Sequence, residues 1–259
     1  MRLLLPAPDR PATDEVDVHA HYAERWLDDG GVRVNFVSSV DGAASANGLS
    51  RGLQTPGDNV VFGVLRDLAD VILVGAATAT AEGYRPAHPS ARRRAIRTGY
   101  GLAEVPAIAV LSGSLELDLT APLYSAALAA PTLIMTGSSA PVGRRNDIID
   151  LTGGKSKLQL VESPSAGGGV DVLAAIDSLR QLGYRRILCE GGPRLFGAAV
   201  AAGAVDELCL SVTPLLAGPA GSRIVTGDGW PPGLRPKLEL IGLLTEDGAL
   251  FCRYRLARA

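Results

Sequence analysis

The sequence predicts an α/β fold, a three-layer α/β/α domain around a mostly parallel central sheet with an antiparallel C-terminal edge. Two observations predict this class. Short apolar runs with strand composition alternate with amphipathic helical runs from residue 32 to residue 212. After that, the last two strand-like runs flank the turn signal Asp247-Gly248, which is typical of an antiparallel hairpin.

The first thirty residues are rich in proline and charge and show no clear period. We therefore predict an N-terminal arm over residues 1–30, with at most one helix near 17–27, and a single domain over 31–259. The run 32–38 has the composition of a strand. The run 56–68 is predicted to be a helix, because Pro56 suits a first turn and its valines and leucines fall on one face.

Short apolar runs in the middle of the chain are bounded by small or polar residues, as buried strands usually are. An arginine-rich stretch at 87–102 interrupts them and is predicted to be a solvated loop or a surface helix. The expected strands lie at 71–74, 105–111, 132–135 and 158–161.

The last third of the chain continues the alternation and then changes to antiparallel pairing. The amphipathic run 170–182 is predicted to be a helix that ends at Gly183. The remaining expected elements are a strand at 186–189, a helix at 195–202, a strand at 207–212, and hairpin strands at 237–244 and 250–254.

Composition excludes several classes of protein. The chain has 25 basic and 27 acidic residues and a net charge of −2, which is unlike a nucleic-acid-binding surface. It contains no apolar run long enough for a transmembrane helix. Cys189, Cys209 and Cys252 lie in apolar runs without metal-site spacing, so we expect free buried thiols in the cytoplasm and no metal site.

Small residues follow the strand at 71–74, where ligands gather in open α/β sheets. Gly75 allows the backbone to approach a phosphate closely. Thr78 would donate a hydrogen bond to that phosphate, and Glu82 would accept one from a ribose hydroxyl. The same residues also suit a plain strand-to-helix turn.

A second candidate site follows the strand at 186–189. Gly191 and Gly192 precede a helix with Pro193 at its start, and free amides at such a start attract anions. Glu190 lies at the end of a buried strand, where an unpaired carboxylate is costly unless it binds a partner.

A third group of polar residues follows the strand at 32–38. It contains Asn35 and Asp41, then Ser50 and Gly52, and then the segment 55–58. An Asx-type turn followed by a helix N-cap would explain the same residues.

Common catalytic motifs are absent from the sequence. It contains no G-x-G-x-x-G after a strand, no Walker loop and no G-x-S-x-G elbow. It also lacks the H-x-E and P-C-x-x-C pair of zinc deaminases.

The three groups together resemble the reductase domain of riboflavin biosynthesis, the pyrimidine reductases with a dihydrofolate-reductase-like fold. The resemblance extends from residue 32 to the C-terminus, and E-G-G-P followed by V-D-E-L is its most specific part. The matching pieces are N-x-x-x-S-V-D-G at 35–42, Ser50, T-P-G-D at 55–58, Leu65-Arg66, A-D-V-I-L-V-G at 69–75, Thr78 with Glu82, I-L-C-E-G-G-P at 187–193 and V-D-E-L at 205–208.

The resemblance implies an enzyme that uses NADPH to reduce the ribosyl side chain of 5-amino-6-(5-phosphoribosylamino)uracil to a ribityl chain, by hydride transfer to C1′. It implies that Asn35, Ser50 and Arg66 bind the substrate, and that Asp58 and Glu190 are the catalytic carboxyls. Glu190 also matches a substrate position, and Asp58 would either hydrogen-bond the pyrimidine ring of the substrate or relay a proton. Asp58, Glu190 and water remain alternative proton sources. The implied cofactor residues are Val37, Gly52, Gly75, Thr78, Glu82, Ser112, Gly191, Gly192, Pro193, Arg194, Leu195 and Phe196.

The sequence departs from the family pattern in two places. Glu82 stands where the family has aspartate, which is a mild change. The segment 83–86 replaces a D-P-x-L stretch and a following basic residue, so Arg85 is the candidate to contact the substrate phosphate. Since only an arm precedes the reductase domain, we expect the deaminase of this pathway to be a separate protein.

Two other functions fit the same residues. A dihydrofolate or pterin reductase would use Asp58 to bind the pterin ring, and a non-catalytic nucleotide-binding protein would keep the fold alone. In every case we expect a small-molecule ligand, no nucleic acid and no membrane. We also expect a homodimer, with the apolar run 208–216 as the candidate contact.

Overall fold

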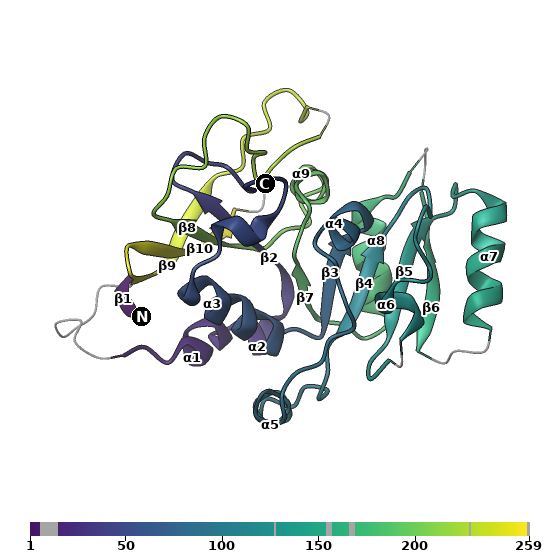
Figure 1. Ribbon diagram of the computed structural model, residues 1–259, viewed down its shortest axis with the longest axis horizontal. Coiled ribbons are helices and arrows are strands. Elements are labelled where there is room, and N and C mark those ends of the chain that lie inside the picture. The colour runs from purple at the N-terminus through teal and green to yellow at the C-terminus, as the bar shows by residue number, and fades with distance from the viewer. Residues whose placement is uncertain (6–14, 127, 154–156, 166–168, 228, 258–259) are drawn as a thin grey trace. The chain divides into compact units, whose positions relative to one another are not determined.

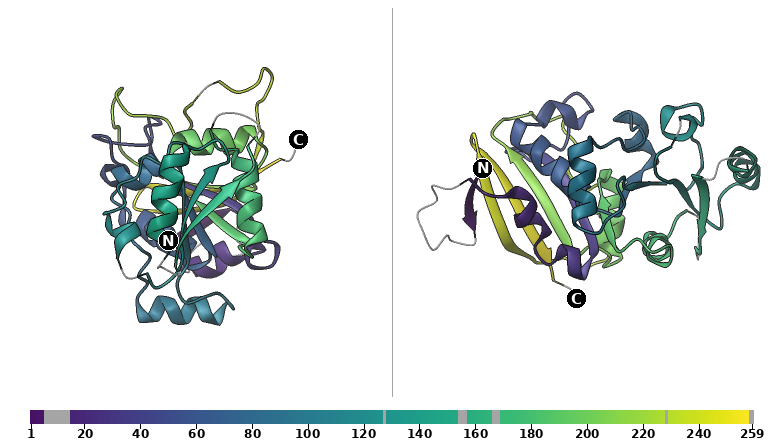
Figure 2. Two further views of the ribbon diagram at one scale, coloured as in Figure 1. Left: turned by 90° about the vertical axis from the view of Figure 1, so that its right-hand side faces the viewer. Right: turned by 90° about the horizontal axis from the view of Figure 1, so that it is seen from below.

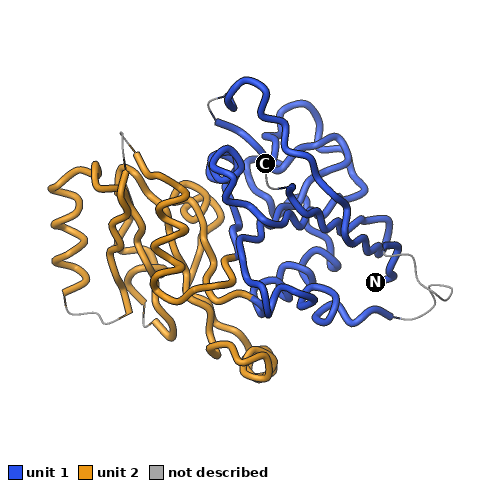
Figure 3. Tube along the Cα trace, turned by 180° about the vertical axis from the view of Figure 1, so that it is seen from behind, with its two compact units in different colours: residues 1–68, 188–259 blue, residues 69–187 orange. Residues whose placement is uncertain are grey.

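The computed structural model describes residues 1–5, 15–126, 128–153, 157–165, 169–227 and 229–257 (Figure 1). The chain forms two units. The first contains Met1–Leu68 and Leu188–Ala259, and the second contains Ala69–Ile187 (Figure 3).

The strands of the first unit follow the order β1-β9-β10-β8-β2. β2 and β8 are parallel, whereas β8, β10, β9 and β1 pair antiparallel in succession. Their bounds are β1 Arg2–Leu5, β2 Gly31–Ser39, β8 Glu207–Thr213, β9 Leu238–Glu246 and β10 Ala249–Leu256.

Successive side chains of a strand point to opposite faces of the sheet, so both faces carry side chains that helices can cover. Helices of this unit pack on both faces. Ser211 lies opposite Phe251 on one face, and Gly57 of α3 packs against Phe251. The other face carries Phe36, whose ring centroid lies 5.3 Å from that of Phe196 in α9. The helices are α3 (Pro56–Asp67) and α9 (Pro193–Ala201), and the short 3-10 helix η1 (Ser50–Leu53) precedes α3.

Helix α3 confirms the helix predicted at 56–68. Thr55 caps it by accepting a hydrogen bond from the Asp58 amide at 3.1 Å, and Pro56 occupies its first turn. Val61 and Leu65 are buried on one side. Asp58 therefore lies at the start of the helix, and Arg66 lies at its end.

The N-terminal segment packs into the first unit where the structure describes it. β1 pairs with β9, and two short helices, α1 (Val18–Ala23) and α2 (Trp26–Asp29), replace the single helix predicted near 17–27. The helix is broken because Arg25 adopts a left-handed conformation with φ of 60°. Tyr22 and Trp26 are buried. The division into an arm and one domain remains a prediction.

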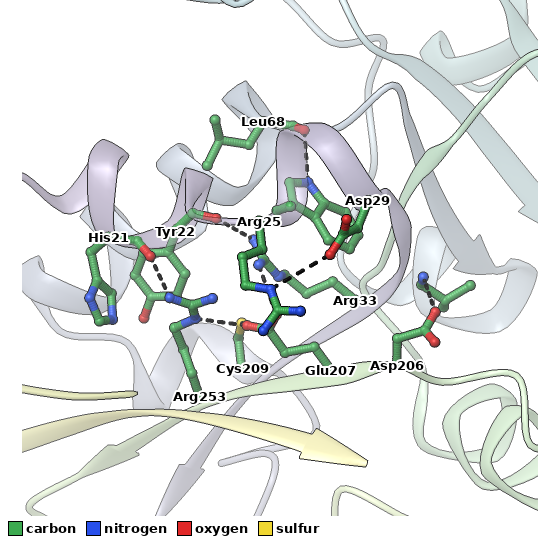
Figure 4. Close-up of polar contacts among 12 residues, drawn as sticks. His21, Tyr22, Arg25, Asp29, Arg33, Leu68, Asp206, Glu207, Cys209 and Arg253 are labelled. Atoms are coloured by element: carbon green, nitrogen blue, oxygen red, sulfur yellow. Dashed lines mark hydrogen bonds and ion pairs between the residues drawn. The ribbon is translucent and has the colours of Figure 1, made fainter. Parts of the chain in front are cut away.

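A buried group of charges holds α1 against the sheet (Figure 4). Glu207 accepts hydrogen bonds from Arg33 at 2.9 Å and from Arg253 at 2.8 Å. Arg33 also donates to the Tyr22 carbonyl, and Arg253 donates to the His21 carbonyl. The two guanidinium groups thus share one carboxylate and satisfy carbonyls at the end of α1, which a helix leaves unpaired.

The strands of the second unit are all parallel and follow the order β3-β4-β5-β6. Figure 2 shows α7 and α8 on opposite sides of these strands. The chain returns to the first unit along β7 (Arg186–Cys189). The other bounds are β3 Val71–Gly75, β4 Ala107–Leu111, β5 Thr132–Gly137, β6 Leu158–Ser163, α4 Ala76–Ala81, α5 Ala91–Gly99, α6 Pro122–Ser125, α7 Val142–Thr152 and α8 Val172–Gln181.

The arginine-rich stretch forms α5, which confirms the surface-helix alternative, but Arg97 is not solvated. Its side chain is fully buried and donates to the carbonyls of Ala69 and Ala103, each at 2.8 Å. A charge in a hydrophilic stretch can therefore serve as a buried link between backbone segments.

A half-buried contact lies where the chain enters and leaves the second unit. Asp70 accepts hydrogen bonds from the amides of Arg185 and Arg186 and from the Arg186 guanidinium. The Asp70 amide donates in turn to the Arg186 carbonyl at 2.9 Å. The first and last segments of this unit are thus tied together.

The predicted fold class is confirmed. Parallel strands in both units, antiparallel strands at the C-terminal end and helices on both faces make a mixed α/β protein. No helix in the described ranges is long and apolar enough to span a bilayer.

Candidate active site

Three polar side chains of the first unit, from β2, β8 and the first turn of α3, lie on the same face of its sheet. Val37 pairs with Ser211 and Asn35 with Cys209 in the parallel β2–β8 ladder, so Asn35 and Ser211 point to the same face. Asp58 lies beside Ser211. Among the described residues, Oδ1 of Asn35 and Oδ1 of Asp58 are buried without a hydrogen-bond partner, and the Ser211 hydroxyl interacts only with the Asp58 carboxyl. These side chains are therefore available to a ligand.

Asp58 is only 3% exposed, and this burial makes its carboxyl a weaker acid. Loss of solvation raises the pKa of this carboxyl above its ordinary value, and an interaction with the Ser211 hydroxyl opposes the shift only in part. Among the described residues, no positively charged side chain neutralises Asp58, which is unusual for a buried acid.

Glu190 and Arg66 form a two-pronged ion pair. Nε of Arg66 donates to Oε1 of Glu190, and Nη2 donates to Oε2, both at 2.7 Å. The Arg66 guanidinium also lies over the Phe62 ring, 4.2 Å from its centroid. The structure therefore joins a predicted substrate residue, Arg66, to a predicted catalytic carboxyl, and it fixes the orientation of the Glu190 carboxylate.

The start of α9 has the features of a phosphate site. Gly192 is its N-cap and provides no side-chain hydrogen bond to the first turn. Gly191 has φ of +83°, and a Cβ there would lie 2.6 Å from the Phe36 ring. Gly191 and Gly192, which precede the first-turn amides of Arg194 and Leu195, thus have no side chains that would keep an anion away from these amides.

Replacing Gly191 with alanine is expected to lower the free energy of unfolding by about 2 kcal/mol or more, because the new methyl group would strain the backbone and collide with Phe36. Urea denaturation would measure the loss. The matched change Gly203→Ala, at a positive φ with open space around its Cβ, isolates the backbone cost. Equal losses for both variants would contradict the role of the Phe36 contact.

The remaining predicted residues of the first unit lie near β2. Val37 is buried on the face that carries Asn35. Ser50 and Gly52 lie in η1, and a Cβ at Gly52 would lie 2.9 Å from the Ala46 side chain. Gly52 thus allows a close turn beside the strand end.

The other five predicted site residues belong to the second unit. Gly75 is the N-cap of α4, Thr78 lies within that helix and Glu82 ends it. Ser112 follows β4, and its hydroxyl accepts a hydrogen bond from the Leu115 amide at 3.0 Å. Arg85 is exposed. Thr78 and Glu82 are half-buried, and the roles predicted for all five remain predictions.

Sequence reasoning missed Ser211 and Phe62. The signal for Ser211 was its place in the alternating strand 207–213, where it is a polar residue on the buried face. Phe62 had no comparable signal, because an aromatic residue four positions before an arginine is common in helices. The described residues contain no group of three or more side chains that could hold a metal ion.

Comparison with known proteins shows the family to which the chain belongs. Residues 31–248 match the family described as the RibD C-terminal domain. A protein of Archaeoglobus fulgidus named 2,5-diamino-6-ribosylamino-4(3H)-pyrimidinone 5′-phosphate reductase is 26% identical over 225 residues, or 86% of this chain and 97% of that protein.

Solved structures show the same fold. A pyrimidine reductase-like protein of Corynebacterium diphtheriae has a TM-score of 0.74 at 25% identity, over 91% of this chain and 95% of that one. RibD of Acinetobacter baumannii has a TM-score of 0.64 at 19% identity, over 88% of this chain and 58% of RibD. The chain therefore belongs to the RibD C-terminal domain family, the pyrimidine reductases of riboflavin biosynthesis.

Proposed function

We propose that this chain is an NADPH-dependent reductase that converts the ribosyl side chain of a 6-ribosylaminopyrimidine 5′-phosphate into a ribityl chain. The start of α9 carries this proposal, because uncapped amides and two glycines after a buried strand fit a cofactor phosphate. Gly191, Gly192, Pro193, Arg194, Leu195 and Phe196 would hold this part of NADPH.

Two substrates are candidates. The sequence resemblance implies 5-amino-6-(5-phosphoribosylamino)uracil. The name of the Archaeoglobus fulgidus relative supports the 2,5-diamino-pyrimidinone that precedes deamination. Both carry a ribosylamine whose C1′ must gain a hydride and whose ring oxygen must gain a proton.

The cofactor and the residues of the chain would have different roles in this reaction. When bound, the reduced nicotinamide supplies the hydride. Glu190, held by Arg66, offers an oriented acceptor for sugar hydroxyls, while Asp58 offers a buried oxygen with no described hydrogen-bond partner. Asn35 and Ser50 remain proposed substrate residues, and Val37 and Gly52 proposed cofactor residues. In the second unit, Gly75, Thr78, Glu82 and Ser112 remain proposed cofactor residues, and Arg85 a proposed phosphate contact.

The loss of NADPH absorbance with purified protein tests this function. The two pyrimidine phosphates, dihydrofolate and a substrate-free control would be compared, with NADH replacing NADPH in a parallel series. We expect turnover of at least one pyrimidine phosphate with NADPH and none of dihydrofolate. Turnover of dihydrofolate alone would identify a pterin reductase, and NADPH binding without any turnover would identify a nucleotide-binding protein.

We also propose that the chain forms a homodimer through the outer face of β8, β10 and β9. Leu250 lies opposite Val212, and Tyr254 lies opposite Leu240, so an apolar surface continues across these strands. Leu240 and Leu250 are 36% and 37% exposed, which is unusual for leucines in the centre of a sheet.

Changing both Leu240 and Leu250 to lysine is expected to halve the mass in solution, from twice 26.8 kDa to that of one chain, because four buried charges would separate the faces. Light scattering after gel filtration measures the mass. Ile149→Lys, at an exposed apolar position in α7, is the matched control and should leave the mass unchanged. A wild-type protein of one chain would refute the dimer.

The three cysteines are free and buried. Unpaired thiols are typical of proteins in a reducing compartment, so we propose that the protein works in the cytoplasm. Fractionation of cells that express the chain would test this location.

A further inference from the structure

The strongest unexplained feature is the set of unmet hydrogen bonds beneath α3. Asn35, Asp58 and Ser211 are 8%, 3% and 1% exposed. One oxygen of Asn35 and one of Asp58 have no described partner, and the Ser211 hydroxyl interacts only with the Asp58 carboxyl. A buried polar group without a partner destabilises a protein, because it loses its hydrogen bonds to water and gains none in return. Two such groups, from β2 and α3, lie with a serine of β8 on one face of the sheet and indicate a site that a ligand completes.

The hydrogen-bonding chemistry of these groups limits the kind of ligand that can bind to them. An ionised aspartate only accepts hydrogen bonds, an asparagine accepts through one atom and donates through the other, and a serine does both. Asp58 lies in the first turn of α3, where the helix dipole favours a negative charge. The site therefore suits a flat ring edge that presents adjacent N–H donors to the carboxylate.

The two candidate substrates differ at that edge. In the 2,5-diamino-pyrimidinone, the 2-amino group and N3–H are adjacent parallel donors. In the aminouracil, C2 carries a carbonyl, so N3–H lies between two acceptors. Adjacent donors then occur only at N1 and the 6-amino nitrogen, on the edge that bears the ribosyl chain.

We propose that Asn35, Asp58 and Ser211 recognise the pyrimidine ring and select the 2,5-diamino-pyrimidinone over the aminouracil. This inference rests on the proposed function and specifies its substrate. The reaction would then precede removal of the 2-amino group, so a reaction that replaces an amine with a carbonyl at C2 must follow it. A carboxylate facing two donors gains charge-assisted hydrogen bonds, whereas one facing a carbonyl is repelled.

Ring binding can be measured without any hydride transfer. Calorimetry would compare 2,5,6-triamino-4(3H)-pyrimidinone with 5,6-diaminouracil, which lack the ribosyl chain and differ only at C2 and N1. We expect the triamino ring to bind roughly ten- to a hundredfold more tightly to the wild-type protein. The ratio of kcat/KM for the two phosphates should show the same preference.

Variants identify the carboxylate as the source of the preference. Asp58→Asn keeps the shape of the side chain but replaces one acceptor oxygen with a donor, so the preference for the triamino ring should disappear or reverse. Asn59→Asp, an exposed isosteric change in the same turn, is the matched control and should keep the wild-type ratio. Thermal denaturation of both variants would show that each remains folded.

The outcomes separate this inference from the proposed function. Equal turnover of both phosphates, or faster turnover of the aminouracil, would overturn the inference and keep the function; a protonated Asp58 would produce that result. Tighter binding of the triamino ring without any turnover would support the ring site and overturn the function. Binding of neither ring, or an unchanged ratio in Asp58→Asn, would overturn the inference.

Discussion

Replacing Glu207 with glutamine is expected to lower the free energy of unfolding by about 3–5 kcal/mol. Glu207 is the carboxylate that Arg33 and Arg253 share, and their side chains are only 1% and 5% exposed. Without it, two buried guanidinium groups would face each other with no counter-charge. Denaturant titration followed by circular dichroism would measure the loss.

An exposed ion pair provides the matched control. Glu239 accepts a hydrogen bond from Arg255 at 3.1 Å, but their side chains are 67% and 45% exposed. Glu239→Gln should therefore change stability by less than about 1 kcal/mol. If both variants lost the same stability, the buried cluster would contribute no more than a surface pair.

The same cluster predicts how stability depends on pH. Burial alone would raise the pKa of Glu207, but attraction to Arg33 and Arg253 outweighs it and lowers the pKa from 4.5 to about 2. A carboxyl with a lowered folded-state pKa stabilises the protein above its unfolded pKa. We therefore expect the advantage of the wild type over Glu207→Gln to shrink as the pH falls from about 4.5 to about 2.

Replacing Arg66 with alanine is expected to raise the substrate KM by roughly tenfold to a hundredfold. The change removes both hydrogen bonds that orient the Glu190 carboxylate, and it removes a guanidinium that is predicted to bind the substrate. The Kd for NADPH should stay within about twofold, because α9 keeps its own amides. Initial rates and fluorescence titration with NADPH measure the two constants.

Conservative and distant changes separate the possible causes. Arg66→Lys keeps the charge but loses the two-pronged geometry, so it should recover only part of the loss. Arg145→Ala, which breaks an ion pair with Glu162 in the second unit, should change neither constant. A loss of NADPH affinity as large as the loss of substrate affinity would show that Arg66 does not act on the substrate.

Much of the fold could be predicted because the spacing of apolar residues along the sequence shows which side of each helix or strand is buried. The strand at 71–74 and the helix at 56–68 appeared where the pattern placed them. Helix α7 was missed because it buries little, with Ile148 inside but Val142 and Ile149 exposed. The break at Arg25 was missed because nothing in the composition marks a left-handed arginine.

The site was predictable only in part. Glu190 and Arg66 were each identified from a motif, but a motif does not show that they pair with each other. Ser211 belongs to the site only through its register opposite Val37, which depends on a strand pairing far along the chain. Contacts between distant segments therefore supplied what local patterns could not.

The tie between Asp70 and Arg186 has a consequence for how the chain can be divided. The second unit is one uninterrupted segment, and hydrogen bonds between Asp70 and Arg186 fasten its two ends to each other. A segment with neighbouring ends can be lifted out or replaced without stretching the polypeptide on either side. This segment therefore begins and ends at one place in the structure, which suits its exchange between relatives.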